Sequence, residues 1–317
     1  QSRLGNPARP ATDLSPGTFM LAVHHGDATW LVVSRTVEPS WSTGDASLVE
    51  RGPIAVTRKA AVPGALPPEL AALGGSDVRL FGARADVCSG RIAELAVMRR
   101  ADVHPSTERI WERESGEPAA IAARIAAAAW DLGADGAMLV GRVESSSSAC
   151  SGAHWGRLAA LPFPTLFVPI PPPPPVAAHA LESFRLLPSW RALQREYTTA
   201  TRAAPDRPWD EHGAARPTVT LWSDGTTQWV SVTHRVALGD CDQWRGRLWA
   251  LFEVEETGLA LRTDVTDPGY HVPVASVDTD GDGAPDFVTE DGLVRRRGDV
   301  HQVVESLAYA RHDRDCR

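Results

Sequence analysis

Five consecutive prolines near the middle of the chain restrict its fold more than any other feature. They occupy positions 171–175 in the stretch FPTLFVPIPPPPPVAAHA. Proline fixes the backbone φ angle and has no N–H, so such a run favours an extended polyproline II spacer. The sequence therefore predicts a first domain over 1–169, a polyproline linker over 170–178 and a second domain over 179–317. A proline-rich recognition motif for another protein is the alternative interpretation.

The segment before the prolines favours β-structure with one helix. Apolar runs on both sides of the Gly-Asp pair at 26–27 predict a β-hairpin that turns there. A Ser-Gly pair at 89–90 indicates another turn. The Ala-rich stretch 117–133 predicts a helix, with Pro118 in its first turn and Gly133 at its end.

The segment after the prolines mixes both kinds of element. A helical pattern over 180–200 is broken at Pro188, and strand-like runs follow between 218 and 265, with a turn at the Asp-Gly pair 224–225. The stretch 298–312 has the apolar spacing of an amphipathic helix. We therefore expect a β-rich α+β fold, with two domains of mainly antiparallel sheet and a few helices.

The net charge of the chain comes from one segment. Residues 264–291 contain eight of the 40 acidic residues and no Lys or Arg, and the other 32 acidic residues balance the 32 basic ones. The hydrophobic fraction of 43% is that of a globular chain. Because no stripe of Lys and Arg is visible, the sequence argues against a nucleic-acid partner.

The cysteines and the start of the chain favour an exported protein. No apolar run reaches the roughly 18–20 residues of a transmembrane helix, and the chain starts at Gln1 without an initiator Met, which fits a processed form. None of the four cysteines lies in a CxxC pattern. Of the three possible pairings we favour Cys88–Cys150 and Cys241–Cys316, each within one predicted domain; four unpaired buried thiols are the alternative. We expect a secreted, periplasmic or cell-surface location.

The stretch DTDGDGAPDF has the pattern of a calcium-binding loop. It places aspartates at positions 1, 3, 5 and 9, and Gly283 at position 6, where the chain must turn sharply. Position 12 is Thr289 and not the bidentate Glu of an EF-hand, although Glu290 and Asp291 follow. A solvated acidic turn without an ion is the alternative, and it would leave the carboxylates to repel one another. The predicted Ca²⁺ ligands are the carboxylates of Asp278, Asp280, Asp282 and Asp286 and the carbonyl of Ala284.

This loop resembles the DxDxDGxxD calcium loops of FG-GAP/VCBS-type repeats, and it is also similar to those of dockerin and thrombospondin type 3 modules. The resemblance covers about ten to fifteen residues and implies the same five ligands. Phe287 occupies the hydrophobic position that follows the last Asp in FG-GAP-like loops. Those families repeat the loop, whereas this chain has it once, so a β-propeller is not implied. The second half also resembles uncharacterised secreted bacterial proteins, which implies no activity.

These observations favour a secreted, non-enzymatic calcium-binding module with a protein or carbohydrate partner. Eleven tryptophans, several of them in the second domain, suit core packing better than an exposed binding row. Adjacent His24 and His25 on a strand would point to opposite faces and would not share a metal. The alternative is an extracytoplasmic hydrolase with a dispersed site, in which a histidine acts beside a carboxylate. The candidate histidines are His104, His154, His234 and His271.

Overall fold

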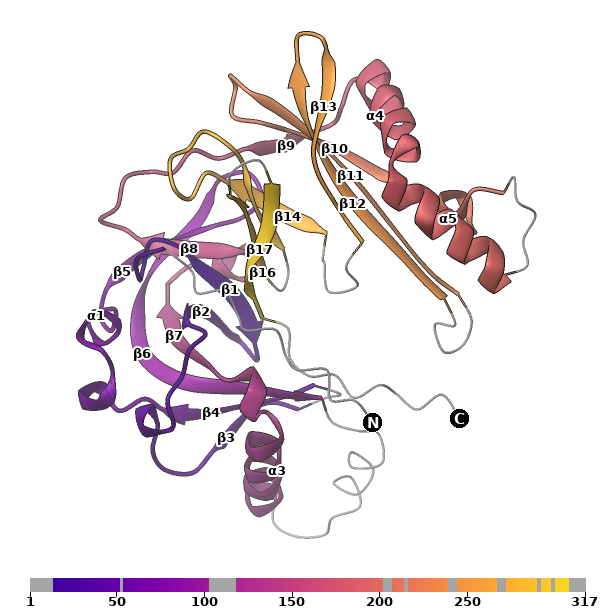
Figure 1. Ribbon diagram of the computed structural model, residues 1–317. Coiled ribbons are helices and arrows are strands. Elements are labelled where there is room, and N and C mark those ends of the chain that lie inside the picture. The colour runs from indigo at the N-terminus through magenta and orange to yellow at the C-terminus, as the bar shows by residue number, and fades with distance from the viewer. Residues whose placement is uncertain are drawn as a thin grey trace. The chain divides into compact units, whose positions relative to one another are not determined.

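The structure is a computed structural model that describes residues 14–51, 54–102, 118–201, 207–213, 216–238, 244–266, 272–289, 292–297 and 300–307. The chain forms two compact units (Figure 1). Unit 1 contains Gln1–Phe163 and Glu305–Asp315, and unit 2 contains Pro164–Val304 and Cys316–Arg317. Both are rich in antiparallel strands with a few helices, so the expected β-rich α+β class is confirmed.

Unit 1 is built on a closed six-stranded barrel. The neighbours run in the order β6, β5, β8, β1, β2, β7, and β7 pairs back to β6. These strands are β1 (Met20–His25), β2 (Ala28–Ser34), β5 (Asp77–Phe81), β6 (Asp86–Asp102), β7 (Met138–Glu144) and β8 (Trp155–Leu158). A barrel of this size has room only for side chains. Buried Met20, Leu31, Leu80 and Ile92 belong to the cluster that fills it.

Strand β6 is the longest element of the barrel, and it replaces the turn expected at 89–90. Its first part pairs with β5, its middle with β7 and its last part with β4. Gly90 lies where β6 passes close to β7, because a Cβ there would be 2.7 Å from the Glu144 carbonyl oxygen. The predicted turn was therefore wrong: the glycine serves a close approach of two strands.

The remaining elements of unit 1 extend or cover the barrel. Strands β3 (Ser47–Glu50) and β4 (Ile54–Ala60) continue the sheet beyond β6. The predicted Ala-rich helix is confirmed as α3 (Pro118–Leu132), whose Ile125 and Ala129 pack on β4 and β6. The predicted hairpin at 26–27 is also confirmed, because β1 and β2 pair up to His25 and Ala28. Short helical segments are α1 (Pro68–Ala71), η1 (Pro39–Trp41), η2 (Pro63–Ala65), η3 (Ala134–Gly136) and η4 (Ser148–Gly152).

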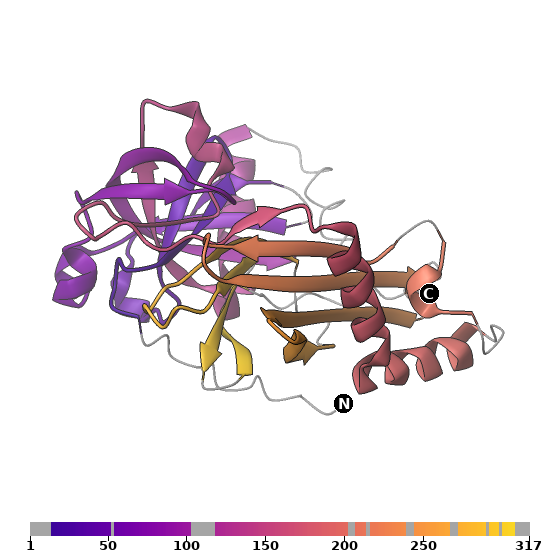
Figure 2. The same cartoon turned by 90° about the horizontal axis from the view of Figure 1, so that it is seen from above.

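Unit 2 has three layers: two helices, a five-stranded sheet and a four-stranded sheet. In the first sheet the order is β13-β12-β11-β10-β9, and in the second it is β14-β15-β16-β17. Helices α4 (Pro174–Leu186) and α5 (Pro188–Thr201) lie against one face of the first sheet (Figure 2). The strands are β9 (Val168–Ile170), β10 (Thr218–Ser223), β11 (Gln228–Leu238), β12 (Trp244–Glu255), β13 (Gly258–Val265), β14 (Pro273–Val277), β15 (Asp286–Thr289), β16 (Gly292–Arg297) and β17 (Val300–Ser306), and η5 spans Trp209–Glu211.

The middle of strand β12 is buried on both faces, which explains its continuous apolar run over 248–252. Leu248 and Phe252 pack with the helices in one core cluster. Trp249 and Leu251 point the other way and pack with Phe287 from the second sheet. The same strand therefore contributes to both cores of unit 2.

Two expectations about unit 2 were wrong. The range 170–178 is not an extended spacer, because Pro174 and Pro175 form the first turn of α4 and Ile170 ends edge strand β9. The first turn of a helix has no intrahelical partner for its N–H groups, so prolines are tolerated there. The stretch expected to be a C-terminal helix instead forms β17, where β-branched valines and pairing with β16 favour a strand.

Candidate metal centre

The acidic loop connects β14 to β15 in unit 2. Its first residue is held in place by a hydrogen bond of 3.0 Å from the Asp278 N–H to the Thr165 carbonyl. Gly281 and Gly283 have φ angles of 80° and 79°, a left-handed conformation that side chains with a Cβ rarely adopt. These two glycines flank Asp282 and let the backbone turn sharply within the loop.

Three of the four predicted aspartate ligands lie together. Asp278, Asp280 and Asp282 each offer a carboxylate oxygen, and these oxygens lie within 4.8 Å of one another. The loop's own backbone supports them, since Gly281 N–H and Gly283 N–H donate to Asp278 at 2.6 and 3.0 Å. Ala284 N–H donates to Asp282 at 2.8 Å. Asp280 and Asp282 are exposed and Asp278 is half-buried, so an ion could reach them from solvent.

Asp286 has different partners from the other three aspartates. Its carboxylate accepts hydrogen bonds from the Thr279 N–H at 3.0 Å, from the Thr279 hydroxyl, and from the Arg296 N–H at 3.2 Å. Burial, despite these hydrogen bonds, raises the pKa of Asp286 to about 7. In this arrangement Asp286 fastens the start of the loop to β16. Glu290 and Asp291 lie outside the described residues.

A protein cation partly neutralises the acidic loop, which sequence reasoning missed. Arg295 on β16 places its Nη2 2.5 Å from Asp280 Oδ2 and its Nε 3.6 Å from Asp286 Oδ2. Its side chain is only 7% exposed. The sequence did not indicate this contact, because Arg295 lies outside the acidic segment and reaches it only through the pairing of β15 with β16.

The loop is anchored in the core of unit 2. Phe287 is fully buried and meets the rings of Trp222 and Trp249 edge-on, at centroid distances of 5.6 and 5.4 Å. His301 on β17 lies beside Phe287, and its Nε2 bonds the Pro285 carbonyl at 3.0 Å. Ala284, the predicted carbonyl ligand, is also buried. A change in the loop is therefore transmitted to the packing between the two sheets.

One predicted disulfide is present, and the other cannot be located. Cys88 and Cys150 are bonded, with a Cα–Cα distance of 5.4 Å, as predicted. Cys241 and Cys316 lie outside the described residues. The bond in unit 1 joins β6 to η4 across 62 residues of sequence.

The candidate histidines do not assemble an open acid–base site among the described residues. His104 and His271 lie outside those residues, and His154 is half-buried in unit 1. His234 and Asp210 are 3% and 0% exposed in the helix–sheet core, and burial lowers the pKa of His234. Arg185, whose side chain is 40% exposed, donates to Asp210 at 2.9 Å, so this carboxylate is engaged in an ion pair.

Comparison of the chain with protein-family models, with curated proteins and with solved structures finds no match. Within the described residues, none of the helices combines the length and the apolar character needed to cross a bilayer. The disulfide and this finding are compatible with an extracellular or periplasmic protein. The function therefore has to be argued from the chain's own residues.

Proposed function

We propose that this protein is a secreted, non-enzymatic calcium-binding protein, in which Ca²⁺ stabilises unit 2 and fixes a surface for a protein or carbohydrate partner. The observation that carries the proposal is the convergence of Asp278, Asp280 and Asp282 within 4.8 Å. Ca²⁺ prefers oxygen ligands at 2.3–2.6 Å from a flexible turn, and carboxylates of this spacing can supply them. The resemblance of the loop to FG-GAP-type calcium loops supports the same ion.

The electrostatics of the loop also favour a bound cation. Arg295 contributes one positive charge near Asp280 and Asp286, whereas the loop carries four carboxylates. Asp278 and Asp282 have no ion pair with any described residue. A divalent ion offsets this remaining repulsion, and Asp286 and the Ala284 carbonyl are further ligands if the loop closes around it.

The test is the free energy of unfolding of the whole chain with EDTA and with Ca²⁺. At a Ca²⁺ concentration 100-fold above the dissociation constant we expect about 2.7 kcal/mol of stabilisation. Asp278→Asn and Asp282→Asn remove ligands and abolish this gain. Glu256→Gln, at the exposed turn between β12 and β13, removes a carboxylate outside the loop and keeps it.

A chain whose stability is equal in EDTA and in millimolar Ca²⁺ would refute the proposal. Equal stabilisation of the Asp278→Asn variant would also contradict it, because the ion would then bind elsewhere. Mg²⁺ at the same concentration should have a smaller effect, since it keeps its waters more firmly than Ca²⁺ does.

A further inference from the structure

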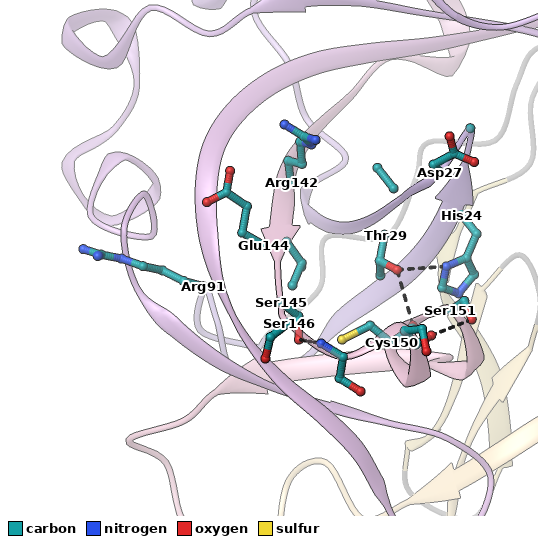
Figure 3. Close-up of a pocket in the computed structure, with 15 residues that line it drawn as sticks. His24, Asp27, Thr29, Arg91, Arg142, Glu144, Ser145, Ser146, Cys150 and Ser151 are labelled. Atoms are coloured by element: carbon teal, nitrogen blue, oxygen red, sulfur yellow. Dashed lines mark hydrogen bonds between the residues drawn. The ribbon is translucent and has the colours of Figure 1, made fainter.

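A polar pocket lies at one end of the unit 1 barrel. Its cavity volume is about 930 Å³, within the range of small-molecule sites. The walls come from the β1–β2 turn, the end of β7, β6 and the serine-rich segment 145–151 (Figure 3). Mouths of β-barrels are common places for ligand sites, because loops from several strands meet there.

The floor of the pocket is held rigidly by the barrel. The disulfide ties Cys150 to β6, and the Thr29 hydroxyl contacts the Cys150 carbonyl at 3.3 Å. His24 uses both ring nitrogens: Nε2 bonds the Ala153 carbonyl at 2.7 Å and Nδ1 bonds Thr29 at 3.2 Å. The Ser145 hydroxyl donates to the Ser89 carbonyl at 2.8 Å. His24 is therefore a positioning residue, and a ligand would meet a preformed surface.

Charged side chains of both signs line this surface without partners. Asp27 comes from the β1–β2 turn, and Arg142 and Glu144 come from the end of β7. Among the described residues, no hydrogen bond or ion pair holds the side chain of any of the three. Arg91, by contrast, donates through Nε to the Gly75 carbonyl at 2.6 Å, and Figure 3 shows it pointing away from the others.

The pattern of these charges selects among ligand classes. A simple anion would meet the carboxylates of Asp27 and Glu144, and a simple cation would meet the guanidinium of Arg142. Among the described residues that line the pocket there is no Trp, Tyr or Phe ring on which the apolar face of a sugar could stack. A ligand that carries both charges satisfies both signs, through a bidentate Arg–carboxylate contact and an ammonium–carboxylate contact.

We propose that this pocket binds a short peptide with free termini, with the α-carboxylate on Arg142 and the α-ammonium on Asp27. The volume of about 930 Å³ exceeds the needs of a single amino acid and suits a di- or tripeptide. The site lies in unit 1 and does not depend on the calcium loop of unit 2. It can therefore be tested in EDTA, and its failure would leave the calcium proposal unaffected.

Isothermal titration calorimetry of the full chain with trialanine tests the proposal. We expect saturable binding, and at least about a tenfold weaker affinity for N-acetyl-trialanine and for trialanine amide, because each lacks one charge. Asp27→Asn and Arg142→Gln should each weaken binding of trialanine to a similar extent. Arg84→Gln, an exposed arginine outside the pocket, is the matched control and should bind normally.

Several outcomes would overturn this inference. No binding of trialanine, or equal binding of the blocked and free peptides, would exclude recognition of the termini. Binding of maltotriose or inorganic phosphate in place of trialanine would assign the pocket to another ligand class. The comparison of free and blocked peptides uses the unaltered chain, so it decides the matter even if a variant fails to fold.

Discussion

Asp286 and His301 should give unit 2 two opposing pH dependences in metal-free protein. Asp286 is 2% exposed, and burial raises its pKa to about 7 from the usual 3.8. His301 is 5% exposed, and burial lowers its pKa to about 4 from the usual 6.5. Both side chains border the same short segment, since His301 bonds the carbonyl of Pro285.

The signs follow from which state binds more protons. The folded state holds the Asp286 proton more tightly than the unfolded state does. The contribution of this proton to the free energy of unfolding is therefore complete below pH 3.8 and is lost as pH rises through 7. The folded state resists protonation of His301, so its contribution is complete above pH 6.5 and is lost as pH falls to about 4. Each pKa unit is worth about 1.4 kcal/mol, which gives roughly 4 kcal/mol for Asp286 and roughly 3 kcal/mol for His301. Between pH 4 and 6.5 the changes that Asp286 and His301 make to the free energy of unfolding have opposite signs and nearly cancel.

Single variants should separate the two contributions. Between pH 6.5 and 4 in EDTA, the unfolding free energy of Asp286→Asn should fall by roughly 3 kcal/mol, whereas that of His301→Gln should rise by a similar amount. The unaltered protein should change little over this range. Urea unfolding followed by tryptophan fluorescence gives the energies, and protection of β12 peptides from hydrogen exchange assigns the transition to unit 2.

The slope with pH is the decisive quantity, because either substitution can lower stability at every pH by disturbing the core. If the free energy of unfolding of both variants changes as little with pH as that of the unaltered protein, neither group titrates as inferred. If Asp286→Asn and His301→Gln slope in the same direction, the assignment of signs is wrong.

Two further predictions concern unit 1. Replacing Cys88 and Cys150 together by Ala should lower its unfolding free energy by about 4 kcal/mol, as expected for a disulfide that spans 62 residues; a shift in the urea midpoint worth less than 1 kcal/mol would contradict this. Gly90→Ala should cost about 1–3 kcal/mol by overpacking β6 against β7, whereas Gly64→Ala, where a Cβ meets nothing within 4 Å, should be nearly neutral. Equal thermal stability of these two glycine variants would show that β6 can move aside.

Local sequence signals predicted the local elements well. The Ala-rich helix α3 and the two-residue turn between β1 and β2 depend on neighbours in sequence, so their patterns were sufficient. The Cys88–Cys150 pair followed from the domain assignment. The error at 89–90 arose because β7, distant in sequence, decided the conformation, and the error at β17 arose because pairing with β16 outweighed the helical spacing. At the prolines the sequence allowed both an extended spacer and the first turn of a helix.

The candidate sites differ in the same way. The aspartates of the calcium loop are adjacent in sequence, so their spacing revealed them, whereas Arg295 needed the β15–β16 pairing to reach them. The barrel pocket combines Asp27 with Arg142, more than a hundred positions apart. The pairing of β2 with β7 brings these segments to the same end of the barrel, and no short sequence motif predicts this pairing.

The return of residues 305–315 to unit 1 makes unit 2 an insertion within the sequence of unit 1. Residues 305–307 are the described part of this return, and the carbonyl of buried Leu307 accepts a hydrogen bond from Arg100. During synthesis, nearly all of unit 2 therefore leaves the ribosome before unit 1 receives its last segment. Unit 2 can fold while unit 1 is still incomplete. A chain truncated after residue 304 would keep nearly all of unit 2 and would lose the last segment of unit 1.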